Sequence, residues 1–375
     1  MKTILYIINT YGFGGLNRVI AEKASYFTDK GYRVHILCVD NQKNVDVKSI
    51  YDERIVHHTI DRDTLDKYLA IPLIGRLIRF VYYRLFLLKA IYSVNPDVVI
   101  STLPMIEPTS VVWLTFWKKR FMEFHGFWDY PKYKITLKAK IQFRLKYGFY
   151  QLIALTQREA GMVSKITGHP VSVIPNPLYV LPTIYSDCSS KNVITMARFS
   201  RQKNLASIVP AWKEIEEKHP DWNLIIMGKG EEDAKIRKAI EDAQLKTVKI
   251  MPYSLNVGER LVDSSIYVLP SLYEGFPLVL LESMSYGVPV VAYDCPCGPS
   301  EVIKDGYDGY VTEYLNPTQL MERVNVLIEN EELRKQMGVR ARKDIQRYNL
   351  DAIMQVWMDL FDGKPIQRIW ELNLH

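Results

Sequence analysis

Short apolar runs and amphipathic stretches alternate along the first half of the chain. Residues 3–9 form an apolar, β-rich run, and residues 16–30 place apolar side chains at helical spacing, with Gly31 as a stop signal. Apolar strands separated by helices indicate a parallel sheet covered on both faces. Further strands are predicted at residues 33–39, 54–60, 97–102, 120–124, 150–155 and 171–175.

The same alternation restarts in the second half. Apolar runs at residues 192–198 and 222–228 predict strands, and the stretches at about 205–218 and 231–243 predict helices. Three later apolar runs, TVKIM, SIYVLP and VPVVAY, continue the pattern. The restart indicates a second sheet rather than an extension of the first.

The break between the two halves predicts the domain organisation. Residues 176–190 combine several prolines with a polar end and are predicted to be a linker. A length of 375 residues suits two domains. We therefore predict two Rossmann-like α/β domains, at residues 1–175 and 191–345. We expect residues 346–375 to hold a helix that packs back on the first domain.

Composition is that of an ordinary globular chain. Hydrophobic residues make up 48% and charged residues 24%, which excludes disorder, and a formal net charge of +6 is too small to indicate nucleic-acid binding. The longest apolar stretch, residues 80–92, falls short of the ~20 apolar residues of a membrane span. The first apolar run is too short for a signal peptide, and no cysteine has zinc-ligand spacing. We expect a cytoplasmic protein with reduced thiols.

A glycine-rich loop separates the first strand from the first helix. Gly12, Gly14 and Gly15 would let the backbone approach a phosphate or sugar at the helix start. The spacing is not a complete G-x-G-x-x-G, because Asn17 occupies the third position. A tight strand–helix turn explains the glycines equally well.

Three cations follow the strand that opens the second domain. Arg198, Arg201 and Lys203 lie at the carboxyl end of that strand, where ligands bind in open α/β sheets. Arginine can clamp a phosphate with two hydrogen bonds, and lysine adds a point charge. In isolation, the segment would be interpreted as a solvated basic loop.

Two carboxylates eight residues apart favour a ligand site. Glu274 lies at a strand end before a Gly-x-Pro turn, and Pro277 suits the start of a helix. Glu282 then falls among apolar residues, where a carboxylate is costly to bury without a partner. Ligand hydroxyls would supply that partner, and the backbone amides of residues 275–279 could meet a diphosphate. Either glutamate alone could instead be a residue without a ligand.

Together these segments resemble the GT-B glycosyltransferases of family 4 over nearly the whole chain. The E-x7-E motif of that family is similar to Glu274 and Glu282. Its (G)RFxxxKN segment is similar to residues 197–204, with alanine in place of the usual glycine, and its first-loop glycine pair to Gly14 and Gly15. The resemblance implies the GT-B fold, in which two Rossmann-like domains with parallel sheets face each other across a cleft.

The resemblance also implies a role for each motif. Arg198 and Lys203 would hold the donor diphosphate and stabilise the charge that grows on it, without a metal. Glu274 would contact sugar hydroxyls, and Glu282 would bind the ribose. We expect no metal and no cofactor besides the nucleotide sugar, which is a co-substrate. The expected donor-binding residues are Gly14, Gly15, Arg198, Lys203, Glu274, Gly275, Phe276, Pro277, Leu278 and Glu282.

His125 is a further candidate at a strand end of the first domain. It follows the apolar run at residues 120–124, and members of the family often have a histidine near the donor sugar and acceptor. A purely structural histidine is the alternative. Residues 295–309 resemble members that build bacterial surface polysaccharides and lipid-linked oligosaccharides. The expected catalytic residues are Glu274, His125, Arg198 and Lys203.

Positive charge is concentrated in one segment. Residues 62–146 contain 15 Lys and Arg against 6 Asp and Glu, a balance of +9, so the rest of the chain carries −3. Aromatic residues are interleaved with these cations, a combination that suits an anionic membrane surface. A solvated basic face is the alternative.

We therefore predict a retaining glycosyltransferase, peripheral on the inner face of the cell membrane. It would transfer a hexose or N-acetylhexosamine from a nucleotide sugar, expected to be a UDP-sugar, to a polyprenyl-diphosphate-linked saccharide. The alternatives are a soluble acceptor, a GT-B sugar-nucleotide epimerase, a non-catalytic sugar-binding protein, and an NAD(P) oxidoreductase. Asp40 at the end of the second strand suits the oxidoreductase, which leaves the motifs of the second domain unexplained.

Overall fold

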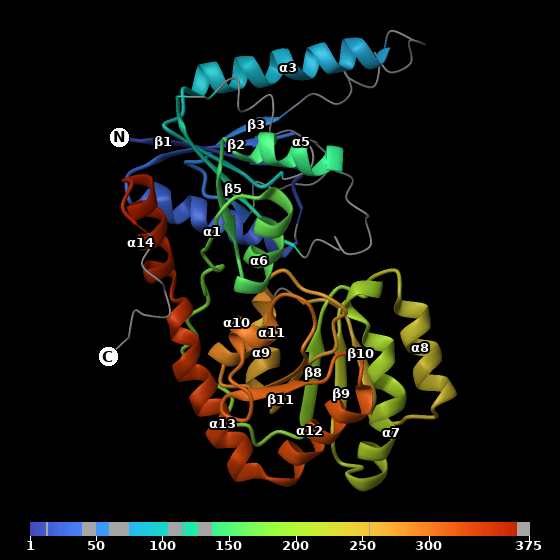
Figure 1. Cartoon of the computed structure of the whole chain (residues 1–375). Helices are drawn as coiled ribbons and strands as arrows, with labels where there is room; N and C mark the ends of the chain where they lie inside the picture. The colour runs from blue at the N-terminus through green and yellow to red at the C-terminus, as the bar shows by residue number, and fades with distance from the viewer. Residues whose placement is uncertain are drawn as a thin grey trace. The chain divides into compact units, whose positions relative to one another are not determined.

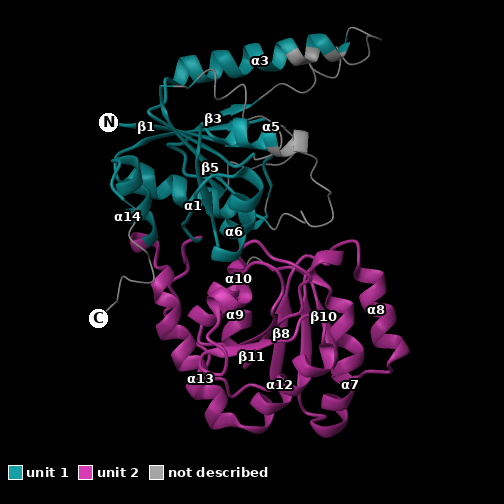
Figure 2. Ribbon diagram, in the orientation of Figure 1, with its two compact units in different colours: residues 1–175, 353–369 teal, residues 176–352, 370–375 magenta. Residues whose placement is uncertain are grey.

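The computed structural model describes residues 1–12, 14–39, 50–59, 75–103, 115, 117–126, 137–254 and 256–365. The chain divides into two compact units (Figure 2). Unit 1 comprises the described residues of 1–175 together with 353–365, and unit 2 comprises those of 176–352. The segment predicted to be a linker, residues 176–190, belongs to unit 2, and the chain returns to unit 1 near its C-terminal helix.

Unit 1 is built on a parallel sheet of seven strands in the order β3-β2-β1-β4-β5-β6-β7. The strands are β1 Thr3–Ile8, β2 Arg33–Cys38, β3 Val56–Thr59, β4 Val98–Ser101, β5 Lys119–Glu123, β6 Gln151–Ala154 and β7 Val171–Val173. The helices of the unit are α1 Gly15–Asp29, α3 Gly75–Val94, α5 Leu137–Tyr147, α6 Gln157–Thr167 and α14 Leu350–Phe361.

The two faces of this sheet are covered by different helices (Figure 1). On one face, Leu87 and Ile91 of α3 pack against Leu5 and Val99 of the central strands. α5 covers the same face further along, over β5 and β6. On the other face lie α1 and α14, whose Phe27 and Phe361 rings are 5.2 Å apart between centroids.

Unit 2 repeats the plan with six parallel strands in the order β10-β9-β8-β11-β12-β13. They are β8 Asn192–Met196, β9 Asn223–Met227, β10 Val248–Met251, β11 Ile266–Leu269, β12 Val290–Tyr293 and β13 Gly309–Thr312. The helices are η3 Arg201–Lys203, η4 Leu205–Ser207, α7 Ile208–Lys218, α8 Asp233–Asp242, α9 Val257–Val262, α10 Leu278–Ser285, α11 Pro299–Val302, α12 Pro317–Glu329, α13 Glu331–Asp344 and η5 Ile345–Tyr348.

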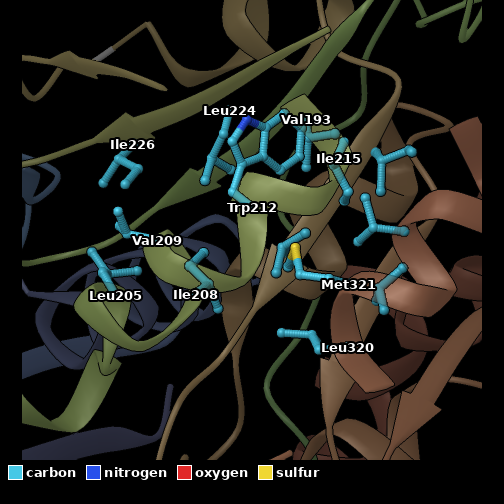
Figure 3. Close-up of a cluster of buried hydrophobic side chains, with 14 of the residues drawn as sticks. Val193, Leu205, Ile208, Val209, Trp212, Ile215, Leu224, Ile226, Leu320 and Met321 are labelled. Carbon is cyan, nitrogen blue, oxygen red and sulfur yellow. The ribbon is translucent and has the colours of Figure 1, made fainter. Parts of the chain in front are cut away.

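The core of unit 2 centres on Trp212 of α7 (Figure 3). Its indole packs among Val193 and Leu224 of the sheet and Met321 of α12. The indole N–H donates to the Thr247 hydroxyl at 2.9 Å, which satisfies the one polar atom of a fully buried side chain. The predicted architecture of two parallel α/β sheets is confirmed.

Candidate active site

The loops that carry the predicted residues of unit 2 follow neighbouring strands. β8, β11 and β12 are adjacent and parallel, so their carboxyl ends lie at one edge of the sheet. The segments that follow them are residues 197–204, 270–277 and 294–298. Motifs that are far apart in the sequence therefore meet at this edge.

Three hydrogen bonds connect the first two of these loops, one between backbone groups and two from side-chain amides to backbone carbonyls. The N–H of Leu272 donates to the carbonyl of Gln202 at 2.8 Å, and the Gln202 amide donates to the carbonyl of Tyr273 at 2.9 Å. Asn204, in the left-handed region with φ 53°, donates its amide to the carbonyl of Pro270 at 3.3 Å. These contacts place the side chain of Lys203 beside the strand end that carries Glu274.

Lys203 and Glu274 form an ion pair at this edge. The Lys203 ammonium lies 2.7 Å from Oε1 of Glu274, and the two side chains are 21% and 7% exposed. The pair is thus reachable from solvent while its carboxylate is largely desolvated, a setting in which charge interactions are stronger than in water. The structure brings together these two predicted catalytic residues.

Arg198 has a different partner. Its Nη2 atom lies 3.2 Å from Oε2 of Glu231, and its side chain is 75% exposed. Exposed ion pairs of this kind contribute little to stability, so a phosphate could replace Glu231 at little cost. Arg198 thus lies in the predicted loop after β8, but its guanidinium is paired with Glu231.

Glu282 lies in the second turn of α10, as predicted, and is buried. Its Oε1 atom accepts a hydrogen bond from the Tyr179 hydroxyl at 2.8 Å. Tyr179 comes from the segment predicted to be a linker, and sequence reasoning assigned it no role. The phenol is the protein partner that the burial of this carboxylate requires.

The segment between the two glutamates has mixed roles. α10 begins at Leu278 after Pro277, so its first backbone N–H groups lack intrahelical acceptors. The ring of Phe276 is instead buried against Tyr348, 5.4 Å between centroids, so its side chain is structural. The structure places the backbone of the predicted donor-binding residues Gly275 to Leu278 at the start of α10.

Gly298 fits the loop after β12 closely against this helix start. Its φ is +149°, and a Cβ there would lie 2.8 Å from Cδ of Pro277. The N–H of Glu274 also donates to the carbonyl of Pro296 at 3.3 Å. The 295–309 segment therefore supports the Glu274 strand end through backbone packing.

A cavity that sequence reasoning missed lies next to these loops. It has a volume of about 430 Å³ and opens at the carboxyl ends of β9 and β10, with Gly228, Arg237, Met251 and Tyr253 in its lining. Gly228 has a φ of +154°, and a Cβ there would collide with the carbonyl of Ala197. The glycine that ends the run WNLIIMG was the feature of the sequence that could have indicated this cavity.

The remaining predicted residues belong to unit 1. α1 begins at Gly15 with Gly14 before it, and a Cβ at Gly14 would meet no atom within 4 Å. The packing of the unit therefore does not require glycine at that position. His125 follows β5, with Nε2 3.3 Å from Oε2 of Glu123 and a side chain that is 7% exposed. His57 contacts the Tyr11 hydroxyl through Nδ1 at 2.6 Å.

Two family models match consecutive parts of the chain. Glycosyltransferase Family 4 matches residues 13–179, and Glycosyl transferases group 1 matches residues 187–344. The second match contains Arg198, Lys203, Glu274 and Glu282.

Several curated relatives with similar sequences are named glycosyltransferases. A Haemophilus influenzae protein named an uncharacterized glycosyltransferase is 24% identical over 95% of this chain and 99% of its own. The amylovoran biosynthesis glycosyltransferase AmsD of Erwinia amylovora is 33% identical over 45% of this chain and 48% of its own. An N,N'-diacetylbacillosaminyl-diphospho-undecaprenol alpha-1,3-N-acetylgalactosaminyltransferase of Campylobacter jejuni is 31% identical over 37% of each chain. The chain spans half or less of the latter two.

Solved structures share the fold over almost the full length. S. aureus TarM, solved with UDP and alpha-GlcNAc-glycerol, has a TM-score of 0.76 at 16% identity over 96% of this chain and 100% of its own. Anabaena HepE, solved with UDP, has a TM-score of 0.77 at 16% identity over 97% and 100%. The chain therefore has the GT-B fold and consists of a Glycosyltransferase Family 4 domain followed by a Glycosyl transferases group 1 domain.

Proposed function

We propose that this glycosyltransferase transfers a hexose or N-acetylhexosamine, with retention, from a UDP-sugar to a polyprenyl-diphosphate-linked saccharide. The observation that carries the donor half is the Lys203–Glu274 pair at the carboxyl edge of the unit 2 sheet. A cation for the leaving diphosphate and a carboxylate for the sugar hydroxyls thus lie within one hydrogen-bond length. UDP in the solved structures of TarM and HepE supports the choice of nucleotide.

Charge supplies the chemistry of the step. When the bond between the anomeric carbon and the diphosphate breaks, negative charge grows on the leaving oxygen. Lys203 stabilises that charge, and Arg198 adds a second cation when it exchanges Glu231 for phosphate. Glu274, released from Lys203, accepts hydrogen bonds from the sugar. With two cations in place we expect no requirement for a divalent metal.

The nucleoside would extend along the same edge. Glu282 would accept from the ribose hydroxyls, alongside the Tyr179 phenol that already contacts it. The cavity at the ends of β9 and β10 has apolar Met251 and aromatic Tyr253 in its lining, which suits a planar base.

The acceptor half of the proposal rests on one relative. The Campylobacter enzyme is named for an undecaprenol-diphosphate-linked acceptor, and AmsD is named for amylovoran biosynthesis. An acceptor on a polyprenyl chain would bring this enzyme to a membrane surface. Among the described helices, none is long and apolar enough to cross a membrane.

α3 provides the face for such a surface. Five large apolar side chains spaced four, four, three and four residues apart form one stripe along the helix and are exposed. They are Leu77, Val81, Leu85, Leu88 and Tyr92, exposed by 63%, 45%, 59%, 49% and 87%. The opposite side of the helix packs on the sheet through Leu87 and Ile91. An apolar stripe outside a helix that is already docked indicates a second apolar partner.

The charges beside this stripe support an anionic bilayer as that partner. Arg84 and Lys89 are exposed at the two borders of the stripe. α5 covers the same face of the sheet, and Leu145 in it is 68% exposed. Apolar side chains bordered by cations match a surface of acyl chains beneath anionic headgroups.

Donor and acceptor screening tests the proposal. UDP release is measured with UDP-glucose, UDP-galactose and the two UDP-N-acetylhexosamines, each with extracted polyprenyl-diphosphate oligosaccharides or with soluble oligosaccharides. We expect one donor to react with the lipid-linked acceptors and the product to keep the donor's anomeric configuration by NMR. Turnover with soluble acceptors alone would refute the lipid-linked acceptor, and conversion of a UDP-sugar to its epimer would identify an epimerase.

A further inference from the structure

A buried group of charged side chains lies beneath His125 in unit 1. Lys23 of α1 donates from its ammonium to Oε1 of Glu123, the last residue of β5, and both side chains are 1% exposed. The indole of Trp357 covers the ammonium, with its ring centroid 4.2 Å from Nζ. Nε2 of His125 lies 3.3 Å from the second oxygen of Glu123. Three elements, α1, β5 and α14, thus meet at this ion pair.

Stability does not explain this pair. Lys23 stands on the buried face of α1, beside Ala24 and one helical turn from Val19 and Ile20, where an apolar residue would continue the core. Replacing a buried ion pair by apolar residues of similar volume is often neutral or stabilising. The charges at this position therefore call for a functional explanation.

Each group of this pair favours the ionised form of the other. Burial lowers the pKa of Lys23, and the carboxylate of Glu123 opposes that shift. Burial also raises the pKa of Glu123, but the charge of Lys23 opposes it, and the pKa of this carboxyl lies below its usual value. Glu123 is thus a carboxylate, able only to accept hydrogen bonds.

The remaining oxygen of that carboxylate lies beside His125. Within the described part of the chain, Oε2 of Glu123 and Nε2 of His125 are both buried without a hydrogen-bond partner, and the two atoms are 3.3 Å apart. A small rotation of the ring completes a bond in which Nε2–H donates to the carboxylate. A neutral imidazole bound in this way carries its proton on Nε2, so Nδ1 is left as an acceptor.

We propose that Glu123, anchored by Lys23, is a positioning residue that fixes the tautomer of His125 and makes Nδ1 an acceptor for a substrate hydroxyl. Our proposal rests on the expectation that His125 faces the donor sugar or the acceptor. An acceptor nitrogen on a ring that is held in place selects a sugar with a hydroxyl at the matching position. An analogue that lacks the hydroxyl leaves the nitrogen unpaired and is rejected.

The test uses a variant that removes both charges, Lys23→Met with Glu123→Leu. Because no ion is left unpaired, this double variant is expected to keep a Tm at or above that of the wild type. Glu123→Gln alone leaves Lys23 buried without its anion and is expected to lower the Tm. The apolar double variant therefore separates positioning from folding.

Tautomers are read by ¹⁵N NMR of the imidazoles at pH 8, with His125→Gln identifying the His125 signals among the seven histidines. The wild type is expected to show a protonated Nε2, and the double variant a mixture of the two tautomers. With the UDP-sugar selected in the donor screen, kcat is expected to fall roughly 10–100-fold, the range for losing a partner that orients a histidine. The Kd for UDP should not change.

Phe361→Leu is the matched control, because it loosens the same face of the sheet without touching the pair. It should lower the Tm and leave both the ¹⁵N signals and kcat unchanged. An unchanged tautomer and kcat in the double variant would show that the pair is only structural. If no UDP-sugar reacts, the proposed function fails, but the ¹⁵N spectra still decide the role of Glu123.

Discussion

Lys203 carries its charge at the edge of the unit 2 sheet without belonging to the core. Its ammonium contacts Glu274, and the rest of its side chain borders solvent. Replacing Lys203 removes little buried apolar surface, so a change in turnover reports mainly on chemistry. Glu274 and Glu282 differ in that their carboxylates are buried, with Lys203 and Tyr179 as their hydrogen-bond partners.

Lys203→Ala should lower kcat/KM for the donor by about 10²–10³-fold, because one fixed charge on the leaving group is lost. Turnover is measured as UDP release and folding as the thermal unfolding transition. Lys213→Ala, at an exposed position of α7, is the control and should behave as the wild type. Near-normal turnover of a folded Lys203→Ala protein would remove Lys203 from the mechanism.

Glu282→Ala and Glu274→Gln should affect different kinetic constants. Contacts to the ribose persist from ground state to transition state, so Glu282→Ala should raise the donor KM. Contacts to the reacting sugar change during the step, so Glu274→Gln should lower kcat. Steady-state kinetics on both variants checks the assignment, and the opposite pattern would exchange the two roles.

Asp308 gives a prediction about stability and pH. Its Oδ1 atom accepts from the N–H of Lys304 at 2.7 Å, and burial raises the pKa of this carboxyl to about 6. The native state then holds the proton more tightly than the unfolded chain, so stability falls as pH rises through about 4 to 6. Between pH 4.5 and pH 8, the free energy of unfolding of Asp308→Asn should increase by roughly 2 kcal/mol relative to that of the wild type, as measured by urea unfolding. A pH-independent difference would contradict this.

At the scale of elements, short loops rather than helices fix the geometry of the edge. The loop after β12 packs against the start of α10 at Gly298, which has a positive φ and no room for a Cβ. Both restrictions act on one residue, and together they set the distance between the Glu274 strand end and the following helix.

Gly298→Ala should therefore destabilise the fold by about 1–3 kcal/mol, the cost of a residue forced into such a backbone conformation. Gly14→Ala is the matched control, since its φ of −74° is ordinary and its Cβ would meet nothing. Denaturant unfolding of both proteins measures the difference. Equal stability of the two variants would show that the loop after β12 can accommodate a Cβ at little energetic cost.

All strands except β13 were predictable from the sequence, whereas α3 was not. Strands of a covered parallel sheet are continuous apolar runs, and each predicted run became a strand. In α3 apolar residues occur both on the side that packs on the sheet, as with Leu87, and on the exposed side, as with Leu85, so no single helical stripe stands out.

Contacts between side chains that are far apart in the sequence could not be predicted from the sequence either. The motif residues could be named, but the Glu231 partner of Arg198 and the Tyr179 partner of Glu282 depend on how the loops fold back. Lys23 and Glu123 are 100 residues apart and lie in segments with different periodicities.

For the whole molecule, the uneven charge and the α3 stripe predict the same behaviour. The full-length protein should float with anionic vesicles at low salt. Raised salt should weaken binding, because the Debye length is ~8 Å at physiological ionic strength and shrinks above it. Basic residues contribute about 1 kcal/mol each near such a surface, so binding should be modest and reversible.

Leu85→Glu with Leu88→Glu should abolish flotation, because two carboxylates then face the headgroups. Val339→Glu, at an exposed position of α13 in unit 2, is the control and should float as the wild type does. Neutral vesicles serve as the lipid comparison. If the full-length protein ignores anionic vesicles at low salt, the stripe does not bind a bilayer and a soluble acceptor becomes the better hypothesis.

The return of the chain to unit 1 at residue 353 has a consequence for synthesis on the ribosome. Residues 176–352 are continuous and can fold as soon as they emerge. Unit 1 begins first but finishes last, because Phe27 and Phe121 lack the aromatic neighbours from α14 until Trp357 and Phe361 have been synthesised. The Lys23 ammonium likewise remains uncovered by the Trp357 indole until that residue has been synthesised. A nascent chain stalled before residue 353 should therefore present a protease-resistant unit 2 attached to an N-terminal half that proteases still cut.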